Sequence, residues 1–116
     1  MKIPEYFKDR EICCPCCGKV PDKTAVYKLY CLRLLLDVPI IVTSGARCEK
    51  YNKKIGGSKN SYHIAGHAFD IKTKNQNADE YNIIKIAQQV GFTGIGINNN
   101  NFIHIDNRFM RAIWTY

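Results

Sequence analysis

Two short, largely apolar segments of this chain contain the ionisable side chains that most restrict its fold. Residues 61–70 and 102–106 hold all three histidines of the sequence, together with two aspartates. A carboxylate inside an apolar strand is costly when it faces the core without a partner, although the outer face of an edge strand would tolerate it. The fold must therefore bring these groups together or expose them. The residues are His63, His67, Asp70, His104 and Asp106.

Two imidazoles and one carboxylate from these segments match the ligands of a catalytic zinc ion. Such a site uses nitrogen and oxygen donors and keeps one tetrahedral position for water. His63 precedes the predicted strand that carries Asp70, so a loop can fold the imidazole back beside the carboxylate, and His104 on a neighbouring strand completes the set. His104 and Asp106 share one strand face because side chains alternate with period two. From spacing alone, structural histidines that are exposed or hydrogen-bonded are an equally open alternative.

The apolar periodicity predicts an α+β fold in one domain that spans residues 1–116. Asp22 is a predicted helix N-cap, residues 38–42 form a β-branched run too short for a helix, and Gly91 ends the last long helix. The order helix, strand, helix, strand, helix, strand, strand predicts a small antiparallel sheet with helices packed on one side. The predicted elements are 22–37, 38–42, 47–54, 68–72, 77–90, 93–97 and 102–105.

Six cysteines are many for 116 residues, and four of them lie close together in residues 1–21, a segment predicted to be irregular. Two overlapping Cys-x-x-Cys pairs there have half the spacing of a structural zinc site, and Cys31 and Cys48 are candidates for the other half. Disulfides are equally open if the protein works outside the cell, and so are free, buried thiols. The six are Cys13, Cys14, Cys16, Cys17, Cys31 and Cys48.

The net charge of +7 comes from 17 lysines and arginines against 10 aspartates and glutamates. This excess favours an anionic partner such as a cell wall, but the basic residues are scattered, so no nucleic-acid partner is expected. No apolar run reaches the roughly 18 residues of a membrane span, and the first residues lack the pattern of a secretory signal. We expect a monomer without a membrane span.

Three ordered motifs give the chain a resemblance to a known family. Residues 61–70 resemble the S-x-H-x-x-G-x-A-x-D signature of the zinc D-Ala-D-Ala carboxypeptidases, whose fold is shared with the Hedgehog signalling domain. Residues 43–48 are similar to the family's S-G-Y-R segment, with Ala46 in place of the aromatic residue, and residues 102–106 resemble the F-V-H-x-D block of its small phage and bacterial branch. The fixed signature positions fall on Ser61, His63, Gly66, Ala68 and Asp70.

The resemblance implies a Hedgehog/DD-peptidase fold with a zinc site and a substrate cleft. Arg47 matches the arginine that binds substrate and steadies an oxyanion, a role for which a guanidinium offers fixed donors. Ser61 and His67 are expected to line the cleft and contact substrate. The zinc ligands that the resemblance implies are His63, Asp70 and His104.

The general base is the position at which this chain departs from the family pattern. Many relatives place Glu or Asp three residues before the last zinc histidine, where this chain has Asn101. An amide does not accept a proton usefully at neutral pH. Asp106 is therefore our replacement candidate, with two alternatives: a carboxylate that supports His104, or one that touches the metal itself.

The function that the resemblance implies is a zinc-dependent peptidase that hydrolyses peptide bonds of peptidoglycan. Its substrate would be a stem peptide or a cross-bridge, cut by a D-Ala-D-Ala carboxypeptidase or an endolysin-type endopeptidase. Such a protein acts at the cell wall, and the absence of a visible signal fits a phage enzyme that stays in the cytoplasm until lysis. The alternative is a catalytically inactive, zinc-containing module that binds the wall or has a structural role.

Overall fold

The structure is a computed structural model that describes residues 6–73, 79–98 and 102–116. It confirms the α+β class, with a five-stranded sheet and four helices in these residues. Asn101 lies outside the described residues. The helices are α1 Asp9–Ile12, α2 Lys23–Leu36, α3 Glu49–Lys54 and α4 Glu80–Gln89, and the strands are β1 Ile40–Ser44, β2 Ala68–Thr73, β3 Gly94–Asn98, β4 Phe102–Asp106 and β5 Ala112–Thr115.

The sheet is mixed rather than wholly antiparallel, which corrects one part of the sequence prediction. Its strand order is β1-β2-β4-β3-β5, and every neighbouring pair is antiparallel except β3 and β5, which are parallel. The sequence analysis did not predict β5. This strand lies at the sheet edge and has only four residues. Two of them are exposed and the other two are only partly buried, so its sequence lacks the apolar pattern that predicts a strand.

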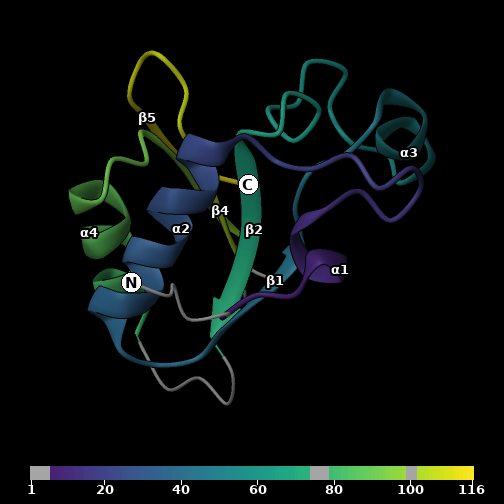
Figure 1. Cartoon of the computed structure of the whole chain (residues 1–116). Helices are drawn as coiled ribbons and strands as arrows, with labels where there is room; N and C mark the ends of the chain where they lie inside the picture. The colour runs from purple at the N-terminus through teal and green to yellow at the C-terminus, as the bar shows by residue number, and fades with distance from the viewer. Residues whose placement is uncertain (1–5, 74–78, 99–101) are drawn as a thin grey trace.

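Helices α2 and α4 lie side by side over one face of the sheet (Figure 1). Each begins at an aspartate cap: the predicted cap Asp22 accepts a hydrogen bond from the Ala25 amide, and Asp79, within the range predicted as helical from residue 77, accepts one from the Asn82 amide. Burying each large apolar side chain of the core stabilises the fold by about 1.5 to 3 kcal/mol. The core between helices and sheet includes Leu29, Leu32, Phe69, Ile71, Ile83, Phe92, Ile95, Ile103 and Ile105.

The opposite face of the sheet carries the polar residues, because strand side chains alternate between faces. In the β2–β4 pairing Asp70 lies opposite His104, and in the β3–β4 pairing Gly96 and Gly94 lie opposite His104 and Asp106. The two glycines leave room on this face. A Cβ at Gly94 would overlap the Asp106 carboxylate, and one at Gly96 would lie 2.6 Å from Cε2 of Trp114.

The other differences from the prediction lie at element ends and in the N-terminal segment. Strand β1 begins at Ile40 instead of residue 38, since Pro39 has no amide to donate to the ladder. Helix α3 begins at Glu49, with Cys48 as its N-cap, and the short helix α1 lies within the segment predicted to be irregular. No helix in the described ranges is both long and apolar enough to span a membrane.

Candidate metal centre and its cavity

Three buried side chains meet on the polar face of the sheet. His63 comes from the loop between α3 and β2, Asp70 from β2 and His104 from β4. Oδ1 of Asp70 lies 3.3 Å from Nε2 of His63 and 3.1 Å from Nδ1 of His104. Ligands about 2.0 to 2.1 Å from a tetrahedral zinc ion lie about 3.3 Å from one another, so the three atoms are spaced as zinc ligands are.

Each histidine is held by its other ring nitrogen. Nδ1 of His63 lies 2.7 Å from the carbonyl oxygen of Gly45, and because a carbonyl only accepts, this nitrogen carries the proton. Nε2 of His104 lies 2.7 Å from Oδ2 of Asp106, which likewise accepts. The remaining nitrogens therefore present their lone pairs toward Asp70, as metal-binding histidines do when an acceptor fixes the tautomer.

Without a metal, the raised pKa of His104 favours an imidazolium whose Nδ1–H can donate to Asp70. Burial alone would lower the pKa of His104, but hydrogen bonds to Asp106 and Asp70 outweigh it and raise that pKa. Burial would raise the pKa of Asp70, yet hydrogen bonds from His104 and His63 hold it well below its usual range. The carboxylate is therefore ionised and ready to bind a cation.

Asp106 lies behind His104 and is fully buried. Arg108 donates to it three times, from Nε at 2.8 Å, from Nη2 at 2.6 Å and from the backbone amide at 3.1 Å. Burial opposes ionisation, but the hydrogen bonds from Arg108 and His104 hold the pKa of Asp106 below its usual range. Both carboxylate oxygens are thus engaged, one of them by His104 and Arg108 together.

Arg47 lies on the other side of Asp70, just before α3. Its Nη2 is 3.3 Å from Oδ2 of Asp70, while Nε donates to Ser44 and Nη1 to Asn52, both at 3.0 Å. Contacts within the described ranges use three of the five guanidinium N–H donors, and the other two are directed to no residue of those ranges. A Cβ at Gly57 would overlap the Asn52 amide and approach Nη1 of Arg47 to 2.9 Å, so this position needs glycine.

A cavity of about 500 Å³ opens over this centre. Arg47 and the three candidate ligands line its floor, and a wall from the end of the chain adds Arg108, Trp114 and Tyr116. The Arg108 guanidinium stacks 4.5 Å from the ring centroids of both Tyr62 and Trp114. Sequence reasoning missed this wall. The one available signal was a run of aromatic residues after the last motif, and such residues are more often simple packing.

The other two predicted substrate contacts, Ser61 and His67, lie in different places in the structure. Ser61 lines the cavity, and its hydroxyl accepts a hydrogen bond from the His63 amide at 3.1 Å. His67 is not among the described residues that line the cavity. Its Nδ1 lies 3.6 Å from Oδ2 of Asp22, at the start of α2. His67 directly precedes β2 and is in phase with Phe69, so strand alternation points it toward the helices and away from the cavity.

Comparison with known proteins confirms the resemblance carried by the three motifs. The sequence pattern of the peptidase M15 family matches residues 5–106. The zinc D-Ala-D-Ala carboxypeptidase of Streptomyces albus G is 34% identical over 110 residues, which cover 82% of this chain and 42% of that protein. The chain therefore spans about two fifths of the length of this relative. With a family match that extends over most of its length and all three candidate ligands, the chain belongs to the peptidase M15 family.

Proposed function

We propose that this protein is a zinc-dependent peptidase that hydrolyses a peptide bond of peptidoglycan. The observation that carries the proposal is the convergence of two imidazole nitrogens and one carboxylate oxygen, each pre-oriented by a neighbour. Membership of the peptidase M15 family supports the same conclusion, as does the likeness to a zinc D-Ala-D-Ala carboxypeptidase. The residues that would hold the ion are His63, Asp70 and His104.

Zinc at such a site supplies an acidified water and polarises a carbonyl oxygen. Arg47 has two N–H donors beside the centre that bond to no residue of the described ranges, and they can hold a substrate carboxylate or stabilise a developing oxyanion. Arg108 lines the opposite wall, although Asp106 neutralises much of its charge. With a divalent ion bound, the centre is net positive, which favours anionic stem peptides over neutral ones.

The reaction also needs a proton acceptor near the metal position. In the part of the chain that the structure describes, Asp70 is the only carboxylate that lines the cavity, and it is itself a candidate ligand. Asp106 supports His104 from a buried position, so we assign it to orienting that imidazole and leave the base unassigned. The lack of a free carboxylate among these residues favours a second candidate function, a zinc-containing module that binds the wall without turnover.

Digestion of purified peptidoglycan by the zinc-loaded protein separates the two functions. A peptidase releases fragments with new amino termini, or free D-Ala, and mass spectrometry of the fragments identifies the cleaved bond as terminal or within a cross-bridge. His104→Ala should lose the zinc ion of the histidine centre and turnover together. Zinc bound by the wild type without any new amine over hours would reject the peptidase and leave the binding module.

A further inference from the structure

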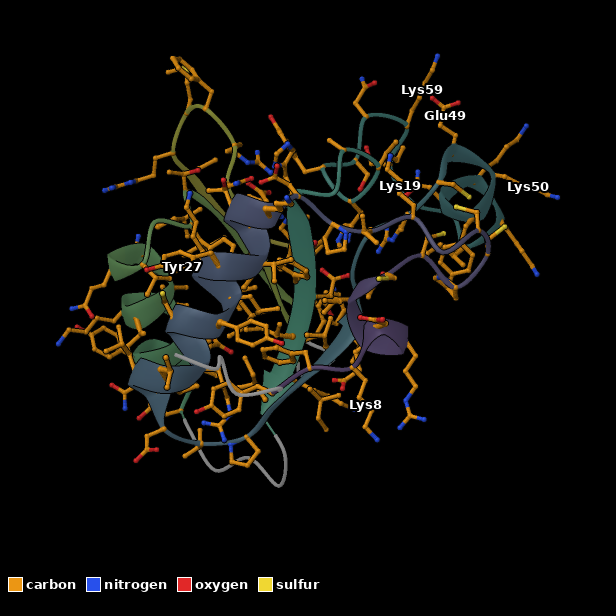
Figure 2. All side chains as sticks on the ribbon, viewed as in Figure 1. Lys8, Lys19, Tyr27, Glu49, Lys50 and Lys59 are labelled. Atoms are coloured by element: carbon orange, nitrogen blue, oxygen red, sulfur yellow. The ribbon has the colours of Figure 1, made fainter. Side chains whose placement is uncertain are left out.

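Four thiols gather where the loop after α1 meets the start of α3, away from the histidine centre. The Sγ atoms of Cys14, Cys17 and Cys48 lie within 4.8 Å of one another. Cys16 lies in the same loop between Cys14 and Cys17, and its thiol interacts with that of Cys48. Figure 2 shows sulfur atoms between this loop and α3, with Lys19 and Lys50 beside them. All six cysteines of the chain are free thiols in the structure.

The backbone around this thiolate cluster is arranged to donate to sulfur. The Cys48 amide donates to Sγ of Cys14 at 3.3 Å, and the Tyr51 amide donates to Sγ of Cys48 at 3.4 Å. Hydrogen bonds of this kind stabilise the charged form of a thiol.

The turn that carries three of these cysteines is closed by its own hydrogen bonds. The Gly18 amide donates to the Cys14 carbonyl and the Cys14 amide donates to the Lys19 carbonyl, both at 2.8 Å. Gly18 has φ +77°, a left-handed conformation that glycine adopts without strain. The sequence Cys-Pro-Cys-Cys-Gly thus forms a tight loop that presents its sulfur atoms to one side, toward Cys48.

We propose that this cluster is a second, structural metal site that holds zinc through thiolates. Sulfur ligands about 2.3 Å from a tetrahedral zinc ion lie about 3.8 Å apart, so three sulfur atoms already within 4.8 Å need only a small contraction. Each thiol releases its proton on binding, and the positive charge of Lys50 near Cys16 offsets part of the resulting negative charge. The ligands are Cys14, Cys17 and Cys48, with Cys16 as the fourth.

This site would tie the N-terminal segment to the residue that follows Arg47. Next to it, the Ala46 amide donates to the Ile12 carbonyl at 2.9 Å, and a Cβ at Gly45 would overlap that same carbonyl. The segment between Gly45 and Cys48 supplies both the carbonyl that holds His63 and the Arg47 guanidinium. The thiolate site is therefore a brace for the floor of the cavity, and it takes no part in the chemistry there.

Zinc content of protein purified under reducing conditions tests this inference without any activity measurement. We expect about two zinc ions per chain in the wild type and about one in Cys48→Ser, while the control Cys31→Ser on α2 keeps about two. His104→Ala should also hold about one. The two single-site variants differ in spectrum: with Co²⁺, His104→Ala keeps a thiolate charge-transfer band in the near ultraviolet, and Cys48→Ser loses it.

The outcomes also separate this inference from the proposed function. If Cys48→Ser does not fold, Cys17→Ser replaces it, because that side chain is exposed and its loss disturbs no packing. A reduced wild type that shows no thiolate band with Co²⁺ would overturn the second site and leave the histidine centre intact. A mass that shows disulfides among these four cysteines in protein recovered without reductant, together with no zinc uptake after reduction, would also overturn it.

Discussion

Replacing Asp106 with asparagine separates an orienting carboxylate from a general base. The side chain receives a 2.7 Å hydrogen bond from Nε2 of His104, whose Nδ1 faces the metal position. A hydrogen bond to a charged group contributes about 1.5 to 3 kcal/mol, and a neutral one about 0.5 to 1.5 kcal/mol. Asp106→Asn keeps the size of the side chain but loses the charge, and one of its two acceptor oxygens becomes a donor, so the support given to His104 should weaken by at least about 1 to 1.5 kcal/mol.

That loss corresponds to about a tenfold weaker zinc affinity, at the lower end of the roughly 10- to 100-fold effect of removing such a supporting group. Competition with a chromophoric chelator measures the affinity of the folded protein directly. Turnover at saturating zinc should then fall little, since His104 is again in place. The matched control is Asp37→Asn at the exposed end of α2, where φ is 56° and asparagine is well tolerated.

A base would behave in the opposite way. Loss of general base catalysis lowers turnover by about 10²- to 10⁴-fold, and zinc affinity would stay at the wild-type value. Unchanged zinc affinity together with such a fall in kcat at saturating zinc would refute the orienting role. It would also show that the fully buried position of Asp106 changes when substrate binds.

Four further outcomes follow from the same geometry. Arg47→Lys should keep zinc but lose the hydrogen bonds to Ser44 and Asn52. Turnover at saturating zinc should then fall at least tenfold, which corresponds to a rise of about 1.4 kcal/mol in the activation free energy. Kinetics equal to those of the wild type would show that Arg47 takes no part in the reaction. Gly94→Ala forces a Cβ against the Asp106 carboxylate, so thermal unfolding should show a loss of about 1 to 3 kcal/mol. Trp114→Ala should raise KM with little change in zinc content, as measured by steady-state kinetics and metal analysis. In the metal-free protein the lowered pKa of Asp70 stabilises the folded state at pH values above about 3.9, the pKa of an aspartate in the unfolded chain. This stability is lost as the pH falls below about 3.9, so the free energy of unfolding, measured against pH, should drop steeply in that acidic range.

The candidate ligands could be predicted because strand alternation is a local property. Apolar residues flank Asp70 in β2 and His104 in β4, which places both polar side chains on the face away from the core, and the registered pairing then sets them side by side. His63 needed the family motif, since nothing in the spacing of a loop residue says where its ring points. The same alternation, applied to His67, would have indicated that it faces the helices.

What could not be predicted depends on contacts between distant segments. The role of Asp106 follows from Arg108, whose guanidinium reaches back two residues because the chain turns after β4. The position of Trp114 follows from the parallel pairing of β5 with β3. The sequence of β5 does not predict this long-range contact, because its four residues are all partly or fully exposed. Sequence patterns report periodicity and capping well, and they report little about an edge strand that is held by its neighbour alone.

The metal centre and the cavity wall are encoded in different parts of this chain. All three candidate ligands and Arg47 lie within residues 5–106, the range that the family pattern matches. Arg108 and Trp114 lie beyond it, yet Trp114 packs over Gly96 and sits 5.3 Å from the His104 ring. Arg108 is tied to the metal centre, because three of its donors hold the Asp106 carboxylate that orients His104, whereas Trp114 meets the centre through ring packing alone. A change at Trp114 should therefore alter the shape of the space above the metal more than metal binding, a change at Arg108 should alter both, and each property has to be measured by its own readout.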